Sequence, residues 1–132
     1  MEAPDELRYS NEHEWVRADE GMAEVGITDY AQDQLGDIVY LDLPAVGAKV
    51  AQNEKMGEIE SVKAVSDLFS PVSGELVEVN QEAIDDPELV NQEPYRRGWL
   101  FKVRLSDAGE LENLLSAEAY RELVAAEEEE AE

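Results

Sequence analysis

The strongest constraint on the fold is a series of short strand-like segments that turn residues interrupt. Residues 37–43 are rich in β-branched and aromatic side chains and are bounded by Gly36 and Pro44. Residues 74–80 follow a Ser-Pro-Val-Ser turn, and residues 99–105 alternate apolar with mostly basic side chains. Further candidates are residues 23–28 and 56–61. Many short strands with frequent turns favour a small sandwich or barrel over a layered α/β fold.

A short helix is expected between the strand-like segments 23–28 and 37–43. Thr28 is a good N-cap residue, and the seven residues after it contain no glycine or proline. Gly36 follows, and glycine is the commonest residue just beyond a helix end. The sequence therefore predicts a helix over residues 29–35.

Two more helices are expected near the C-terminal end. Asp107 and Glu110 have the spacing of a capping box, and leucines follow at positions 111, 114 and 115. Ser116 precedes a similar apolar stripe at positions 120, 123 and 124, after which the chain becomes a run of glutamates. We expect one domain over residues 1–132, with a core at about 20–105, helices at about 107–126 and a solvated acidic tail at 127–132.

An internal repeat indicates how the strands are organised. Residues 36–41 and residues 74–79 share the pattern glycine, acid, aliphatic, valine, any residue, aliphatic. Two similar halves of this kind would fit a flattened β-barrel built around a pseudo-twofold axis.

Composition excludes several classes of function. The chain has 33 acidic and 10 basic residues and a net charge of −23, so nucleic acid and anionic membrane surfaces are poor partners. There is no cysteine, which excludes thiolate metal sites and cysteine nucleophiles, and the single histidine, His13, provides no metal-binding cluster. No glycine-rich phosphate loop is present. We therefore expect no metal and no catalytic residues, and a protein that carries a chemical group rather than transforming one.

Lys63 is the best candidate for carrying such a group. Strand-like residues precede it and follow it, so Val62 and Lys63 are expected at the tip of a hairpin with the amine in solvent. An exposed amine on a rigid turn suits an enzyme that must acylate one lysine among four. The spacing alone favours an ordinary surface lysine in a strand over this functional interpretation.

Several segments of the chain, with Lys63 in one of them, match the motifs of a known family. The segment Glu60-Ser61-Val62-Lys63-Ala64, with Ser70-Pro71-Val72-Ser73-Gly74-Glu75 downstream, resembles the lipoyl-lysine motif of the glycine cleavage system H-protein family. The resemblance covers roughly residues 7–123. Biotin-carrier domains of the same architecture usually have Met-Lys-Met around the modified lysine, where this chain has Val62-Lys63-Ala64. The other matching segments, in order, are 13–15, 26–33, 35–37, 43–44 with Gly47, 78–80, 89–91, 94–95 and 98–99.

The resemblance implies a fold, a cofactor and partners. The fold would be a mostly β barrel-sandwich hybrid with short helices and a C-terminal helical segment, and lipoate would be attached to Lys63. The protein would be a non-catalytic monomer that carries an aminomethyl group from the pyridoxal-phosphate enzyme glycine decarboxylase to the aminomethyltransferase. Electrons would pass to dihydrolipoamide dehydrogenase, and a lipoyl-attaching enzyme would modify the lysine. The expected location is a bacterial or archaeal cytoplasm rather than a mitochondrial matrix.

The resemblance also implies which residues form the cleft that holds the aminomethyl group, whose amine is a cation. Positions matching Glu14 and Asp67 are cleft carboxylates in the family. Glu12 departs from the family, where that position is often serine, so it is a third candidate without an assigned role. For His13 we favour a packing role that positions the Glu14 strand over a role in proton transfer.

Three other functions remain open from the sequence. A protein of the same fold could relay lipoyl or octanoyl groups to other enzymes. An acidic adaptor could bind partners with Lys63 unmodified. A biotin carrier is a more distant alternative.

Overall fold

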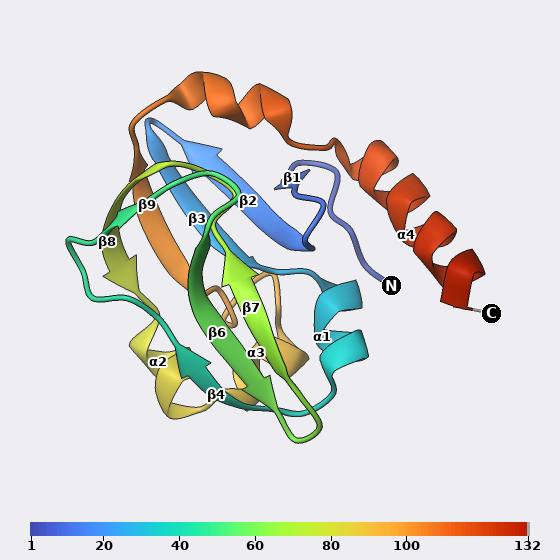
Figure 1. Cartoon of the computed structure of the whole chain (residues 1–132). Helices are drawn as coiled ribbons and strands as arrows, with labels where there is room; N and C mark the ends of the chain where they lie inside the picture. Colours follow the sequence, from blue (N-terminus) through green and yellow to red (C-terminus); the bar gives the residue numbers. More distant parts are fainter. Residues whose placement is uncertain (132) are drawn as a thin grey trace.

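The computed structural model describes residues 1–131, which form two antiparallel sheets with helices around them (Figure 1). The larger sheet has six strands in the order β1-β2-β3-β9-β8-β5, and the smaller has three in the order β4-β6-β7. Within the described residues the two sheets stay separate and do not close into one barrel. The strands are β1 (Arg8–Tyr9), β2 (Glu14–Asp19), β3 (Met22–Ile27), β4 (Ile38–Asp42), β5 (Lys49–Val50), β6 (Lys55–Ser61), β7 (Val65–Phe69), β8 (Gly74–Val79) and β9 (Phe101–Leu105).

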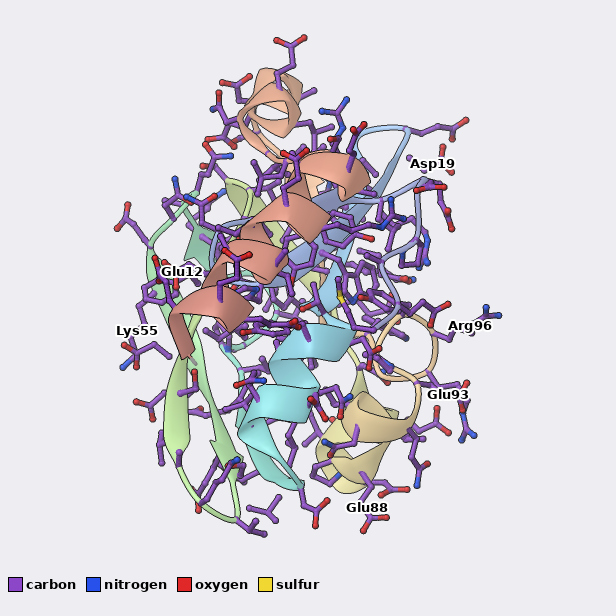
Figure 2. The ribbon with its side chains drawn as sticks, turned by 90° about the vertical axis from the view of Figure 1, so that its right-hand side faces the viewer. Glu12, Asp19, Lys55, Glu88, Glu93 and Arg96 are labelled. Carbon is purple, nitrogen blue, oxygen red and sulfur yellow. The ribbon has the colours of Figure 1, made fainter. Side chains whose placement is uncertain are left out.

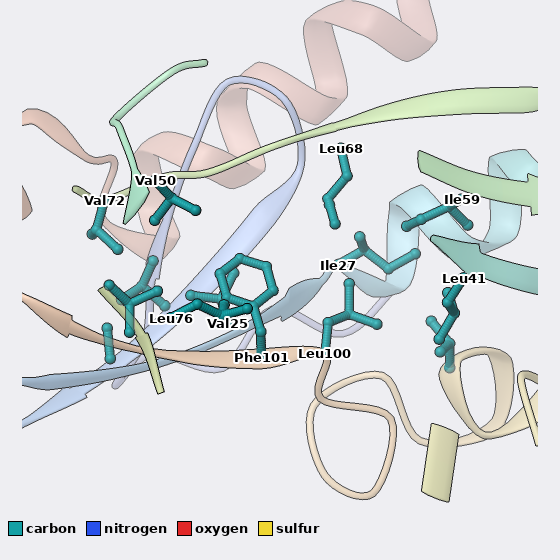
Figure 3. Packing of buried hydrophobic residues seen from close by; sticks show 14 of the residues in the cluster. Val25, Ile27, Leu41, Val50, Ile59, Leu68, Val72, Leu76, Leu100 and Phe101 are labelled. Carbon is teal, nitrogen blue, oxygen red and sulfur yellow. The ribbon is translucent and has the colours of Figure 1, made fainter. Parts of the chain in front are cut away.

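The predicted strands are confirmed, and the two repeat segments fall in different sheets. Residues 36–41 contribute β4 to the small sheet, and residues 74–79 form β8 in the large one. The main core lies between the sheets, as Figure 3 shows for Ile59 and Leu68 on one side and Ile27 and Leu100 on the other. Each of these four side chains is at most 3 % exposed. Burying a side chain of this size contributes about 1.5–3 kcal/mol, so this layer holds the small sheet against the large one.

The helix α1 (Asp29–Leu35) has the predicted bounds. The Thr28 hydroxyl accepts a hydrogen bond from the Ala31 amide, and the Gly36 amide donates to the Gln32 carbonyl. Gly36 has φ 80° and ψ −158°, a conformation that is almost restricted to glycine. Two short helices that we did not predict, α2 (Gln81–Asp85) and α3 (Glu88–Gln92), precede β9.

The C-terminal helices differ from the prediction. The capping-box segment forms a short 3-10 helix, η1 (Ala108–Asn113), rather than an α-helix. The Glu110 carboxylate does not return to the Asp107 amide but accepts hydrogen bonds from the Ser73 amide (2.8 Å) and hydroxyl (2.7 Å). This long-range pairing removes the capping-box bond that would have supported a longer helix.

The last helix, α4 (Ala117–Ala131), continues about one turn past its expected end at residue 126. Residues 127–131 are therefore helical; residues 128–130 are exposed, as the predicted solvated tail requires, whereas Glu127 is half-buried, and residue 132 lies outside the described residues. A second cluster of buried residues holds α4 on the large sheet, and the rings of Tyr9 and Tyr120 stack within it at 4.5 Å. Trp15 belongs to this cluster while its neighbour Val16 faces the main core, because successive side chains of a strand point to opposite faces.

Candidate functional site

Lys63 lies at the tip of the β6–β7 hairpin, as predicted. The last cross-strand pair is Glu60 with Val65, and the Ser61 amide donates to the Ala64 carbonyl at 2.8 Å. The buried Ser61 hydroxyl also accepts hydrogen bonds from the amides of Lys63 (3.3 Å) and Ala64 (3.2 Å). The turn is therefore closed by several short-range hydrogen bonds that fix its backbone.

The hairpin tip is also held by the loop that follows α1. The Val62 amide donates to the Asp37 carbonyl at 3.0 Å, and the Asn91 side chain donates to the Gly36 carbonyl at 2.9 Å. The hairpin extends beyond α1 at the lower edge of Figure 1. The side chain of Lys63 is exposed, and among residues 1–131 no carboxylate forms an ion pair with its ammonium group.

A cavity of about 340 Å³ lies along β7, the strand that leads away from Lys63. All three predicted cleft carboxylates, Glu12, Glu14 and Asp67, line this cavity. Its walls come from α1, β6, β7, α4 and the start of β2, and they include apolar side chains such as Leu35 and Ile59. The structure thus brings together residues that are more than 50 positions apart in the chain and gives them a partly apolar surrounding.

Glu14 is the most deeply placed of these acids, with 2 % of its surface exposed. Burial raises the pKa of its carboxyl group to about 8, an effect that a hydrogen bond from Ser10 opposes. The Ser10 hydroxyl lies 2.5 Å from Glu14 Oε1, and the Phe69 amide lies 3.4 Å from Oε2. Because this pKa lies above 7, burial favours the neutral form of the Glu14 carboxyl group at pH 7.

Asp67 and Glu12 are exposed and border the same cavity. Asp67 Oδ1 lies 3.1 Å from the ammonium of Lys55, which also contacts Glu58 at 2.9 Å. The Glu12 amide donates to the Ser10 hydroxyl at 3.3 Å, and no side-chain hydrogen bond of Glu12 occurs within residues 1–131. Figure 2 shows Glu12 and Lys55 on the same side of the molecule, next to the C-terminal end of α4.

His13 packs against α4, in agreement with the favoured interpretation. Its Nδ1 atom lies 2.8 Å from the Tyr120 hydroxyl, and its Nε2 atom lies 3.0 Å from a carboxylate oxygen of Glu127. The Tyr120 hydroxyl also lies 2.7 Å from Thr28 Oγ1. These contacts connect α4, the residue before β2 and the cap of α1, and they hold the cavity residues His13 and Glu127 in place.

Glu127 is an acidic residue of the cavity that the sequence analysis did not predict. It lines the cavity from α4, and its Oε2 atom is buried without a well-directed hydrogen bond in the described residues. The sequence predicts a solvated tail here, because Glu127 begins a run of glutamates. Its spacing from Tyr120 and Val124, seven and three residues, continues the apolar stripe of the helix and was the available signal.

The residues that the structure describes contain neither a metal-ion cluster nor a helix that could span a membrane. Residues 1–131 contain no group of three or more histidine, cysteine, aspartate or glutamate residues placed to hold a metal ion. No helix among them is both long and apolar enough to cross a bilayer.

Two sheets with an exposed lysine on a tight hairpin define the class of lipoyl-type carrier domains. Comparison with solved structures supports this class: a crystal structure of a glycine cleavage system H protein from Mycobacterium marinum matches with a TM-score of 0.81 and 43 % identity, covering 89 % of this chain and 94 % of that one. The predicted fold class is thereby confirmed.

The sequence comparisons identify the family. The model of the family described as Glycine cleavage H-protein matches residues 7–127. A glycine cleavage system H protein of Alcanivorax borkumensis is 57 % identical over 91 % of this chain and 94 % of its own length, and one of Marinobacter nauticus is 56 % identical over 96 % and 98 %. The chain belongs to the glycine cleavage H-protein family, as the sequence motifs indicated. Its members are non-catalytic lipoyl carriers that act with the other components of the glycine cleavage system.

Proposed function

We propose that Lys63 is the lipoyl attachment residue and that the acidic cavity receives the cargo. The observation that supports this most directly is the position of an exposed amine, unpaired within residues 1–131, on a hydrogen-bonded turn one strand away from a cavity lined by carboxylates. A lipoyl group in amide linkage there would supply the disulfide chemistry of the carrier, while the protein supplies attachment, orientation and protection.

The residues of the cavity suit a small cationic cargo. An aminomethyl group carries an amine that is positively charged near neutral pH and is lost by hydrolysis when water reaches it. Asp67 can hold such an amine by a charge-assisted hydrogen bond at the rim, and Glu14 can do so at the bottom. Apolar side chains such as Ile27 and Leu35 reduce the access of water.

Glu14 couples binding of the cargo to release of a proton. Its pKa of about 8 in the empty cavity means that most molecules carry a neutral carboxyl group at pH 7. A cation brought next to this group favours its ionised form and lowers its pKa. Binding of the amine is therefore expected to expel a proton from Glu14 in this pH range.

The proposed reaction sequence follows from the family. The protein would receive the aminomethyl group at glycine decarboxylase, deliver it to the aminomethyltransferase, and pass electrons to dihydrolipoamide dehydrogenase. The net charge of −23 supports brief contacts with several enzymes, because long-range attraction raises encounter rates without requiring tight complexes. We include in this proposal a single carrier unit over residues 1–132, a monomeric state and a cytoplasmic location.

Mass spectrometry of the protein produced in a lipoate-competent bacterium tests the attachment. We expect the lipoyl mass increment on the peptide that contains Lys63 and none in the Lys63→Arg variant. An unmodified lysine would favour the acidic adaptor. A modified protein that fails in reconstituted glycine cleavage but donates its acyl group to other enzymes would favour the lipoyl or octanoyl relay, and reactivity with avidin would indicate biotin.

A further inference from the structure

Asp67, one of the proposed cleft carboxylates, already forms an ion pair with an ammonium group of the protein itself. Lys55 Nζ lies 3.1 Å from Asp67 Oδ1 and 2.9 Å from Glu58 Oε2. Asp67 lines the cavity, whereas Lys55 approaches the carboxylate from outside it. The cation on Asp67 is a primary ammonium group, the same kind of cation that the cargo presents.

A β-bulge gives Lys55 this position. In a regular strand, residues three apart point to opposite faces, so Lys55 and Glu58 would be separated. The pairing of β6 with β7 shifts register between Lys55 and Gly57, and Glu58 pairs directly with Asp67. The shift brings the Lys55 ammonium to the face that carries both acids.

The close packing of Gly57 maintains this irregularity. A Cβ atom added to Gly57 would lie 2.4 Å from the carbonyl oxygen of Asp42 on the neighbouring strand β4. Only a residue without a side chain fits such an approach. The backbone position of Lys55 is therefore set by the pairing of the small sheet.

We propose that Lys55 is an internal competitor for Asp67 that the cationic cargo must displace. This inference depends on the proposed function of the cavity. Lys55 pairs with Asp67 while the cavity is empty and moves to Glu58 alone when the cargo amine arrives. Because one ion pair replaces another, the net free energy gained by binding the cargo amine at Asp67 is small. A carrier that must give up its cargo at the next enzyme benefits from such weak retention.

The test is the lifetime of the aminomethylated protein after Lys55→Gln. We measure the first-order release of ammonia from the lipoylated, aminomethyl-loaded protein at low ionic strength. Removing the competitor should lengthen the lifetime about two- to five-fold, the range expected for one exposed ion pair. The difference should shrink in high salt, which screens exposed charges. A lifetime equal to or shorter than that of the unchanged protein would overturn the proposal.

Lys49→Gln is the matched control. Lys49 is an exposed lysine on β5 that forms no ion pair within residues 1–131, and its substitution makes the same change in net charge. The lifetime of this variant should equal that of the unchanged protein. A lengthening as large as that of Lys55→Gln would show a general charge effect and would overturn the specific role of Lys55.

A double-mutant cycle separates this proposal from the proposed function. Asp67→Asn should shorten the lifetime, and adding Lys55→Gln to it should have no further effect, because the carboxylate for which Lys55 competes is gone. If Asp67→Asn leaves the lifetime unchanged, the cargo cavity itself is refuted. If Asp67→Asn shortens the lifetime but Lys55→Gln acts equally with and without Asp67, only the competition is refuted.

Discussion

The side chain of Lys63 lies over Gly36, so that a Cβ atom added to Gly36 would be 3.5 Å from Lys63 Cε. Gly36 ends α1, and the next carbonyl, that of Asp37, accepts the hydrogen bond from the amide of Val62. The end of a helix and the turn that carries the lysine thus form one structural unit. This arrangement explains how a single exposed amine can be presented in a defined place.

Replacing Gly36 by alanine should disturb both stability and modification. The backbone conformation of Gly36 costs a residue with a side chain about 1–3 kcal/mol, and the added methyl group would contact the lysine stem. We expect Gly36→Ala to lower the free energy of unfolding in urea by this amount and to slow lipoylation of Lys63 by purified ligase. Gly21→Ala is the control, because Gly21 also has a positive φ (81°) but no atom lies within 4 Å of its added Cβ. Equal lipoylation rates in the two variants would contradict the proposed contact.

Lys63 itself should matter for function and not for folding. The residue is exposed on a turn, and substitutions at such positions usually change stability by less than about 0.5 kcal/mol. We expect Lys63→Ala and Lys63→Arg to unfold at the same urea concentration as the unchanged protein but to support no glycine cleavage in a reconstituted system. Lys49→Gln should retain full activity. Glycine cleavage by either Lys63 variant would refute the attachment site.

Much of this site could be predicted from local sequence. The hairpin around Lys63 and the helix between Thr28 and Gly36 follow from turn, strand and cap preferences, which depend on neighbouring residues. The prediction was wrong where a distant partner decides the structure. Ser73 takes the carboxylate of Glu110 that we expected to cap its own helix. Such long-range contacts leave no local pattern.

The cavity, too, combines residues that were predicted from the sequence with contacts that depend on distant parts of the chain. Glu14 and Asp67 were proposed from the resemblance to the family, but the burial of Glu14 and its raised pKa depend on β7 lying across the start of β2. The pairing of Lys55 with Asp67 depends on a bulge that no spacing rule indicated. Glu127 was assigned to solvent because the charge run outweighed its helical spacing from Tyr120.

The buried carboxyl of Glu14 should make the protein less stable as the pH rises. Its folded-state pKa of about 8 is above the ordinary value of 4.5, so between these values the folded protein binds more protons than the unfolded chain. Stability from this group is therefore full below about pH 4.5 and is lost progressively until about pH 8. Glu14→Gln removes the titration. We expect the variant to gain on the order of 4 kcal/mol relative to the unchanged protein between pH 5 and pH 8.5.

Urea unfolding at several pH values measures this difference directly. Asp42→Asn controls for the loss of one acidic residue, because Asp42 is exposed and does not line the cavity. Parallel curves for Glu14→Gln and the unchanged protein would show that Glu14 is ionised in the folded state.

The rate at which the protein loses its aminomethyl cargo should depend on the carboxylates that line the cavity and not on the net negative charge of the protein. Asp42, Glu58 and Asp67 are cross-strand neighbours on β4, β6 and β7, but only Asp67 lines the cavity. We expect Asp67→Asn to release ammonia from the aminomethylated protein several-fold faster, whereas Asp42→Asn leaves the rate unchanged. Faster release from both variants would indicate an effect of net charge and would contradict a specific binding role.

The attachment of α4 should depend on the hydroxyl of Tyr120. This oxygen is buried between Thr28 Oγ1 (2.7 Å) and His13 Nδ1 (2.8 Å), and Tyr120→Phe would leave both partners without it. Unpaired buried polar groups cost about 1–3 kcal/mol, so we expect unfolding at lower urea concentration and faster amide hydrogen exchange in α4. Tyr40→Phe is the control, because Tyr40 is 56 % exposed and its hydroxyl has no hydrogen bond within residues 1–131. If α4 closes the cavity through these contacts, the aminomethylated Tyr120→Phe protein should also release ammonia faster. Unchanged exchange in α4 would show that ring packing alone holds the helix.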